Sequence, residues 1–342
     1  MHGNELVVED FALPSMTDGA VRVRVKACGI CGSDLHYLRH AHRMKSLGDE
    51  MTANNPPAPV SVVSADLDRG IVMGHEFCAE VTELSAGVTH LKEGDLVVSM
   101  PIAIDAGGVH AVGYSNLYPG GYGEEMMLSG MLCTKVPNGL SYQHAALTEP
   151  MAVGVHAVNK SKIVPGESAV VIGCGPVGLA CIAALKAKGI SPIIAADFSP
   201  GRRALASTMG ADVVVDPRDE SGIQAWYRVD GRSTVVQFEA VGVPDMIDRT
   251  MLTAPKDSRI LIVGVCMESD AIRPIIGISK ELTIQFALGY DPVEFGGALR
   301  SIAEGEFNVE PLITGTVDVD GVPQAFRDLA DPERHAKILV CP

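Results

Sequence analysis

The sequence predicts an α/β protein of two domains, and three observations support this fold class. The chain has 342 residues, more than one ordinary hydrophobic core accommodates. Its first part holds short alternating segments separated by glycine and proline, which is typical of a β-rich domain. From about residue 162 to 288, strand-like and helix-like segments alternate, as in a parallel sheet with crossover helices. We expect one domain over 1–152, completed by 290–342, and a second over 153–289.

The individual elements follow from hydrophobic periodicity. In the first domain, valines alternate with basic residues, and we expect strands at Val21–Ala27, Ile71–Val72, Ala79–Leu84, Leu96–Met100 and Cys133–Val136. The parallel sheet is expected to contain Ala169–Ile172, Pro192–Ala196, Val213–Val215, Val235–Glu239, Arg259–Val263 and Leu282–Phe286. The tail is expected to return to the first domain through a helix near Phe295–Glu304, the segment Ala325–Leu329 and a last strand Lys337–Val340.

Composition excludes several function classes. The hydrophobic content of 47% and mean hydropathy of +0.21 indicate a well-buried globular protein. We expect no membrane segment, because no apolar run reaches the roughly 18 residues that cross a bilayer. The formal net charge of −15 argues against nucleic-acid binding, which needs a basic face. The N-terminus lacks the pattern of a secretory signal, so we expect a cytoplasmic protein.

The eight cysteines are scattered, mostly in apolar contexts, and we interpret most of them as reduced core residues. A possible metal site begins with Cys31 and continues at His75 and Glu76, with a further carboxylate at Glu149 in an apolar stretch. A thiolate, an imidazole and carboxylates together suit a zinc ion, and a buried carboxylate needs a partner such as a cation. Taken singly, Cys31 is also compatible with a core thiol, a redox pair with Cys28 or half of a structural zinc site.

A second motif, VVIGCGPVGL, follows a predicted strand and opens an apolar helix over Pro176–Lys188. Glycines there permit a tight turn and a close approach of the backbone to a pyrophosphate, which the helix N-terminus stabilises. The sequence therefore predicts a dinucleotide-binding turn made by Gly173, Gly175, Pro176, Val177 and Gly178.

Asp197 ends the next predicted strand. A carboxylate at this place accepts hydrogen bonds from the ribose hydroxyls of NAD and repels the 2′-phosphate of NADP. We therefore expect NAD(H) as the cofactor. Arg202 or Arg203 is a candidate to flank the adenine, and a plain surface helix explains both arginines equally well.

In order along the chain, "ACGICGSDLH", "GHE", "EGDLVV", "GGYGEEMML", "KVPNGLSYQHAALTEPMAVGVHAV" and "VVIGCGPVGL" resemble the motifs of the zinc-dependent medium-chain dehydrogenases, the alcohol dehydrogenase superfamily. The Glu-Pro pair at Glu149 is most similar to the sorbitol, polyol, butanediol and threonine dehydrogenase branch. The resemblance implies a β-rich GroES-like catalytic domain and a Rossmann cofactor domain with a doubly wound parallel sheet. It also implies NAD-dependent hydride transfer between an alcohol and a ketone or aldehyde.

By the same resemblance, Cys31 and His75 are zinc ligands that catalysis requires. Glu76 and Glu149 supply the third ligand and an exchangeable fourth, and either one is compatible with direct binding. Asp34 resembles the carboxylate that orients the ligand histidine.

Ser33 resembles the hydroxyl that exchanges a proton with the substrate oxygen, and His36 a histidine that relays this proton to solvent. The rival functions are a zinc-free NAD(P)H-dependent quinone or enoyl reductase and a non-catalytic nucleotide-binding relative. The complete set of expected ligands, and Asp197, argue against both. The substrate is expected to be a secondary alcohol or a polyol, with aryl and terpenoid alcohols left open.

Two departures from the family pattern carry expectations of their own. The stretch between Asp95 and Cys133 lacks the four cysteines of the family's structural zinc, so we expect one catalytic zinc per chain and no structural zinc. The segment Arg39–Gly70, with prolines at 56–59, is longer than usual. It is interpreted as a solvated surface loop, or else as a lid over the substrate or an oligomer contact. The family also implies a homodimer or homotetramer, for which Leu282–Phe286 is the expected edge strand.

Overall fold

The computed structural model describes residues 1–55, 63–137 and 139–342, and the chain divides into two compact units. Unit 1 contains 1–149, 313–331 and 337–342, and unit 2 contains 150–312 and 332–336. The division differs from the sequence-based bounds at 150–152 and 332–336, and over the longest stretch at 290–312, which belongs to unit 2. The reason is the helix α9 (Pro292–Ala303), which buries an apolar face that includes Phe295 and bonds His156 through Glu294.

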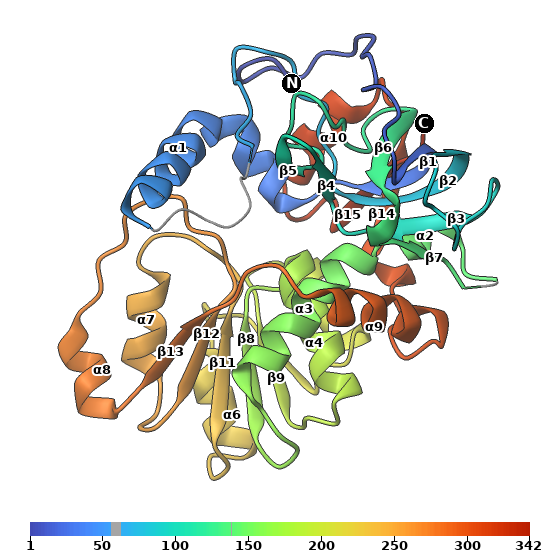
Figure 1. Ribbon diagram of the computed structural model, residues 1–342. Coiled ribbons are helices and arrows are strands. Elements are labelled where there is room, and N and C mark those ends of the chain that lie inside the picture. The colour runs from blue at the N-terminus through green and yellow to red at the C-terminus, as the bar shows by residue number, and fades with distance from the viewer. Residues whose placement is uncertain (56–62, 138) are drawn as a thin grey trace. The chain divides into compact units, whose positions relative to one another are not determined.

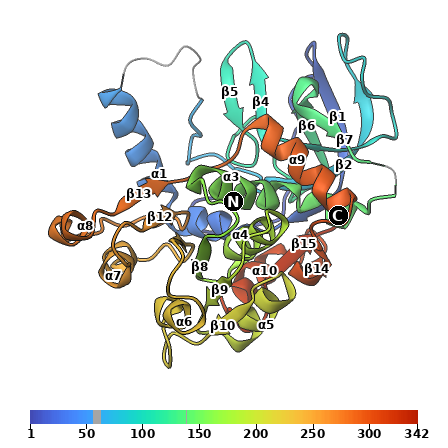
Figure 2. The same ribbon diagram turned by 90° about the horizontal axis from the view of Figure 1, so that it is seen from below.

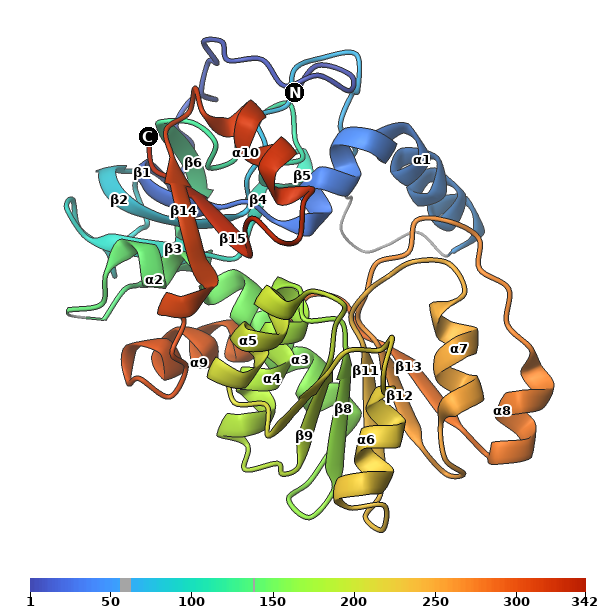
Figure 3. The same ribbon diagram turned by 180° about the vertical axis from the view of Figure 1, so that it is seen from behind.

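Unit 1 is built on a seven-stranded sheet in the order β14-β15-β1-β2-β3-β7, with β6 paired to β1. Its strands are β1 (Ala20–Gly29), β2 (Glu76–Leu84), β3 (Leu96–Ser99), β6 (Glu125–Ser129), β7 (Cys133–Lys135), β14 (Ile313–Val317) and β15 (Lys337–Val340). The alternation in β1 buries Val21, Val23 and Val25 and leaves Arg24 exposed. Figure 3 shows β14 and β15, from the end of the chain, side by side.

Around this sheet lie α1 (Gly32–Asn54), α2 (Tyr142–Ala146), α10 (Val322–Leu329), the 3-10 turn η1 (Gly130–Leu132) and a hairpin of β4 (Ile102–Asp105) with β5 (Gly108–Ala111). The expected strand Ile71–Val72 was wrong. That segment is irregular, because its backbone bonds irregular neighbours at Met1 and Gly120 instead of a strand.

The expectation of a loop from residue 39 onward was also wrong for its first part. Helix α1 continues to Asn54, with one non-helical residue at His40. The run from Met44 to Met51 is rich in helix formers, contains no proline, and holds an ion pair of 3.1 Å between Lys45 and Asp49 one helical turn apart. The prolines at 56–59 lie outside the described residues.

Unit 2 is a six-stranded parallel sheet in the order β10-β9-β8-β11-β12-β13. Its strands are β8 (Ser168–Ile172), β9 (Ile193–Ala196), β10 (Val213–Val215), β11 (Val235–Glu239), β12 (Arg259–Ile262) and β13 (Thr283–Phe286). Strand order reverses between β8 and β11, which is where doubly wound sheets bind ligands. Strands β9, β8, β11, β12 and β13 of this sheet are labelled in Figure 1, and the predicted α/β fold class is confirmed.

The helices of unit 2 cover both faces of this sheet. They are α3 (Thr148–Ser161), α4 (Pro176–Ala187), α5 (Pro200–Thr208), α6 (Gly222–Val229), α7 (Met246–Thr253), α8 (Pro274–Lys280), α9 and the 3-10 turn η2 (Glu310–Leu312). Figure 2 shows α6 and α7 on one face and α4 on the other. Among the helices that the structure describes, none is long and apolar enough to span a bilayer.

Candidate functional site

Two chain segments converge at the end of β1 in unit 1. Strand β1 ends at Gly29 and α1 begins at Gly32, which leaves Cys31 at the helix N-cap. Strand β2 begins at Glu76, and the antiparallel register sets Glu76 opposite Gly29. A Cβ atom on Gly29 would lie 2.1 Å from Glu76 Oε2, so only glycine leaves room for this carboxylate.

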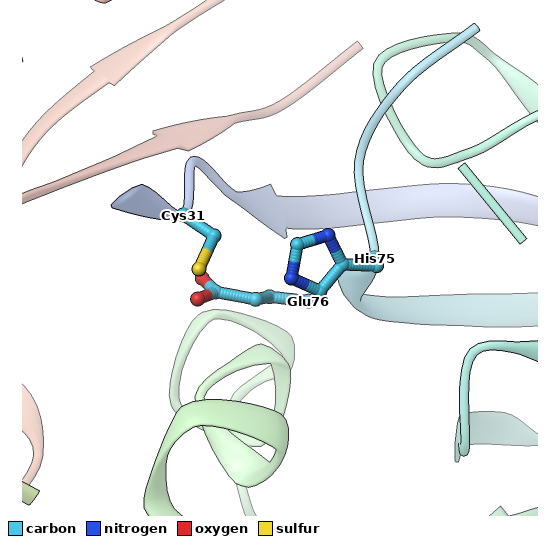
Figure 4. Close-up of side chains that lie close together, drawn as sticks. All are labelled: Cys31, His75 and Glu76. Atoms are coloured by element: carbon cyan, nitrogen blue, oxygen red, sulfur yellow. The ribbon is translucent and has the colours of Figure 1, made fainter. Parts of the chain in front are cut away.

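This convergence brings Cys31, His75 and Glu76 together. One ligand atom from each lies within 4.8 Å of the others, and Figure 4 shows the three side chains pointing toward one another. His75 and Glu76 are buried, with 8% and 0% of their surface exposed. Over 1–55, 63–137 and 139–342, this is the one group of three such side chains close enough to hold a metal ion. A thiolate, an imidazole and a carboxylate fit a zinc ion.

Glu149, at the start of α3, does not belong to this group of three. It is nevertheless close enough for its charge to raise the pKa of Lys337. Glu76 therefore completes the group with Cys31 and His75, and Glu149 lies outside this group.

Asp34, fully buried in the first turn of α1, contacts His75 and the backbone of Cys31. Its carboxylate accepts hydrogen bonds from Tyr122 Oη at 2.6 Å, Tyr114 Oη at 2.7 Å and the Cys31 amide at 3.1 Å. His75 Nδ1 lies 3.4 Å from Asp34 Oδ1. Burial opposes ionisation of Asp34, but the charge of His75 and the two tyrosine hydroxyls outweigh it, so the pKa of Asp34 lies below its usual value.

The contact between Asp34 and His75 also shifts the pKa of His75. Burial favours neutral imidazole, but the Asp34 carboxylate outweighs burial and holds the pKa of His75 well above its usual value. Since Nδ1 faces Asp34, the other ring nitrogen is the one available to a metal. Binding a metal there would release a proton.

A buried lysine that the sequence analysis missed lies against Glu76. Lys337 Nζ, at the start of β15, lies 2.7 Å from each carboxylate oxygen of Glu76 and donates to the Ile30 carbonyl at 3.0 Å. Only 1% of Lys337 is exposed. Burial opposes its charge, but Glu76 and Cys31 outweigh burial and raise the pKa of Lys337. The available signal was a lysine inside the apolar run AKILV.

Ser33 and His36 lie three residues apart in the first turns of α1, a spacing that puts both on one face of the helix. Ser33 Oγ is 3.1 Å from the hydroxyl oxygen of Tyr114. His36 is half-buried, and burial together with the nearby charges of His40 and Arg39 lowers its pKa.

The stretch between Asp95 and Cys133 contains the hairpin β4–β5. Asp105 at its turn accepts hydrogen bonds from the hydroxyl of Tyr118 at 2.8 Å and from the Gly107 amide at 2.7 Å, and His110 Nε2 lies 3.0 Å from the same carboxylate. His110 is buried, and its ring packs against that of Tyr118 at an angle of 49°, with centroids 4.8 Å apart. Hydrogen bonds and ring packing hold this hairpin together.

In unit 2, the glycine-rich turn joins β8 to α4. Gly173 has a φ of 92°, which favours glycine, and a Cβ on Gly178 would lie 2.0 Å from the Gly173 carbonyl oxygen. A Cβ on Gly175 would meet no atom within 4 Å, so the space beside it is open. Pro176 and Val177 then open α4, whose free amides face the turn. This geometry is that of a phosphate-binding turn.

Asp197 follows β9 at the carboxyl edge of the sheet. Its two oxygens accept hydrogen bonds from the Cys174 amide at 2.7 Å and the Ser199 amide at 2.8 Å, which hold the carboxylate beside the turn. The Arg203 guanidinium donates hydrogen bonds to the Asp197 and Phe198 carbonyls, and these bonds restrict its movement toward a ligand. Arg202 differs, because its buried Nε has no partner among the described atoms.

Comparison with known proteins identifies the family of the chain. Residues 17–138 match the family model "Alcohol dehydrogenase GroES-like domain", and residues 176–304 match "Zinc-binding dehydrogenase". The (R,R)-butanediol dehydrogenase of Bacillus subtilis is 34% identical over 99% of this chain and 97% of its own. A probable D-xylulose reductase A of Aspergillus fumigatus is 30% identical over 95% and 91%. The crystal structure of 2R,3R-butanediol dehydrogenase from Bacillus subtilis superimposes with a TM-score of 0.83 at 32% identity, covering 100% of this chain and 97% of that one.

Proposed function

The chain belongs to the zinc-dependent medium-chain dehydrogenases of the alcohol dehydrogenase family, and on this premise we propose that it oxidises a secondary alcohol or polyol to the ketone, with NAD⁺ as hydride acceptor. The observation that carries the proposal is the buried group of Cys31, His75 and Glu76. The names of the relatives, a butanediol dehydrogenase and a D-xylulose reductase, support a substrate with neighbouring hydroxyl groups.

We infer one zinc per chain, held by Cys31, His75 and Glu76, with Glu149 as the exchangeable ligand, and no structural zinc. Two observations support this: the described residues hold a single ligand group, and the stretch from Asp95 to Met131 contains no cysteine. Bound zinc supplies Lewis acidity, which lowers the pKa of a substrate hydroxyl and polarises a carbonyl.

The remaining steps belong to side chains of unit 1. The Asp34 carboxylate faces His75 Nδ1 at 3.4 Å, a charge contact without a hydrogen bond, and this leaves the other nitrogen for the metal. During oxidation Ser33 Oγ accepts the proton of the substrate hydroxyl and releases its own hydrogen toward His36, and during reduction the two transfers reverse. His36 passes the proton on toward solvent, and its lowered pKa keeps the imidazole able to accept a proton near neutral pH.

The cofactor is held by unit 2. The open space beside Gly175 and the free amides at the start of α4 accommodate the pyrophosphate. Asp197 accepts hydrogen bonds from the ribose hydroxyls and excludes a 2′-phosphate, which favours NAD(H) over NADP(H). Arg202 is assigned to the adenine side, because Arg203 is committed to backbone carbonyls.

A homodimer or homotetramer joined through β13 and a cytoplasmic location are further parts of the proposal. Strand β13 is an edge of its sheet, and Phe286 on it is 66% exposed. An exposed apolar edge is costly to leave uncovered and favours pairing with a second copy.

The direct test follows NADH formation by the purified protein with 2,3-butanediol, xylitol, sorbitol and benzyl alcohol. We expect turnover of at least one diol or polyol with NAD⁺ and its loss in Cys31→Ser. If no alcohol is oxidised by zinc-loaded protein with either NAD⁺ or NADP⁺, the proposal is wrong. Reduction of a quinone by zinc-free protein would instead support the reductase.

A further inference from the structure

A buried carboxylate ends strand β11 at the point where the order of the parallel sheet reverses. Glu239 is the last residue of β11, and only 1% of its surface is exposed. Its Oε1 atom accepts hydrogen bonds from the amides of Val241 at 2.7 Å and Gly242 at 3.0 Å. One carboxylate oxygen therefore fixes two successive amides of the loop that leaves β11. Neither the metal group nor the glycine-rich turn contains this carboxylate.

The loop that Glu239 holds packs tightly between two other segments of unit 2. On one side it meets the glycine-rich turn, because a Cβ atom on Gly173 would lie 2.8 Å from Val241 Cγ2. On the other side, a Cβ atom on Gly242 would lie 2.5 Å from the Val265 amide nitrogen. The loop therefore has a fixed place between the turn after β8 and the segment after β12, and close contacts limit its movement toward either one.

The place of the loop relates it to one half of a dinucleotide. A doubly wound sheet binds the two nucleotide halves on opposite sides of the point where its strand order reverses, which here lies between β8 and β11. Asp197, the proposed partner of the adenosine ribose, follows β9 on one side of this point. The loop after β11 lies on the other side, where the nicotinamide half belongs. Val241 on this loop is apolar and 41% exposed, so its side chain is available to a ligand.

We propose that Glu239 is a positioning residue for the cofactor: its carboxylate oxygen holds the loop 240–242 as a preformed wall of the nicotinamide half of the site. This inference rests on the proposed function, because it concerns a bound dinucleotide. The acceptor oxygen performs this role, and the negative charge is not required. Burial, together with the charge of Asp270, raises the pKa of Glu239 although both amide hydrogen bonds oppose the shift. The alternative is that Glu239 only stabilises unit 2.

Two substitutions separate the acceptor oxygen from the rest of the side chain. Glu239→Gln keeps the length and one carbonyl oxygen, which can accept from both amides. Glu239→Met keeps the length and offers only a weak thioether acceptor. The matched control is Asp230→Ala, at the opposite, amino edge of the same sheet. Asp230 Oδ2 accepts hydrogen bonds from the hydroxyls of Ser168, at 2.6 Å, and Ser233, so this variant also loses two hydrogen bonds to one carboxylate.

The experiment measures the binding of NAD⁺ and of AMP to each protein by calorimetric titration, and the melting temperatures in parallel. A loop that adopts its binding conformation about a tenth of the time weakens apparent binding about tenfold. We therefore expect Glu239→Met to bind NAD⁺ about tenfold more weakly, and Glu239→Gln to stay within about twofold of the wild type. AMP occupies only the adenosine half and should bind each variant as it binds the wild type. Asp230→Ala should lower the melting temperature without weakening NAD⁺ binding.

Hydrogen exchange of the wild-type protein is a second test, and it decides the question if Glu239→Met does not fold. The amides of Val241 and Gly242 should already exchange slowly without NAD⁺, because Glu239 holds them in the free protein. Addition of NAD⁺ should change their exchange little. If both amides exchange as fast as those of an unfolded chain and become slow only when NAD⁺ binds, the wall is not preformed and the proposal is wrong.

Wild-type affinity of Glu239→Met for NAD⁺, at any melting temperature, would overturn the proposal and leave Glu239 with a stabilising role only. Equal weakening of NAD⁺ binding by Glu239→Gln and Glu239→Met would overturn the assignment to the acceptor oxygen. Equal weakening of AMP and NAD⁺ binding would assign the loss to general damage of unit 2. Failure of the wild-type protein to bind NAD⁺ is a separate result, which removes the proposed cofactor and with it the role of Glu239.

Discussion

Replacing Lys337 by methionine tests the buried charges of the site. Lys337 contacts both oxygens of Glu76 and the Ile30 carbonyl, and neither charged group of the pair is exposed to water beyond 1%. Methionine keeps most of the volume but leaves the Glu76 carboxylate buried without its cation. Removing one partner of a buried pair costs about 3–5 kcal/mol, since the desolvation of the other charge is no longer compensated.

This loss is large enough for thermal unfolding to detect. For a unit of this size, 1 kcal/mol corresponds to about 2–4 °C, so Lys337→Met should lower the melting temperature by roughly 6–20 °C. The assay is scanning calorimetry with a chelator present, so that zinc does not stabilise Glu76 in any sample. The double variant Lys337→Met/Glu76→Gln should recover part of the loss, because the orphaned charge is gone. Melting of Lys337→Met within about 2 °C of the wild type would refute the reasoning.

Four further predictions concern the metal, the cofactor and assembly. Cys31→Ser should lose bound zinc and oxidation activity together, as metal analysis would show; retained zinc contradicts Cys31 as a ligand. Asp197→Ser should lower the ratio of kcat/KM for NAD⁺ over NADP⁺ at least tenfold, and an unchanged ratio refutes the role of Asp197. Gly178→Ala should lower the melting temperature, because its Cβ meets the Gly173 carbonyl at 2.0 Å. Gly175→Ala should keep the wild-type melting temperature and bind NAD⁺ more weakly in calorimetric titration. A lower melting temperature for Gly175→Ala than for Gly178→Ala would contradict the turn geometry. Phe286→Asp should shift the protein to a smaller species in gel filtration, and a wild-type monomer would exclude pairing through β13.

Much of the fold could be predicted because the periodicity of the sequence is local. Strands β10, β11 and β15 have the bounds that the sequence predicted, and α4 begins at Pro176 in the glycine-rich motif, as predicted. The first part of the loop prediction was wrong because α1 continues past His40, where Ala41 is buried and Met44 packs against the core although the segment has no strong apolar face. Likewise α9 packs in unit 2 through contacts such as His156 with Glu294, which are distant in the sequence.

The candidate site shows the same limit. The motifs around Cys31 and His75 pointed to the metal group, because the residue types themselves carry the chemistry. Lys337 and Tyr114 could not be found this way. Each is far from α1 in the sequence, and only the pairing of β15 with β1 and the course of the chain after β5 bring them to the site. The sequence also could not show which of Glu76 and Glu149 lies in one group with Cys31 and His75, because both carboxylates have apolar neighbours in the sequence.

The zinc content of the purified protein tests the central claim most directly. Elemental analysis after dialysis without chelator should give one zinc per chain, held by the group that contains Cys31, His75 and Glu76. Two zinc ions per chain would contradict the single catalytic site. No zinc, in protein that still binds NAD⁺, would contradict the assignment of this group as a metal centre.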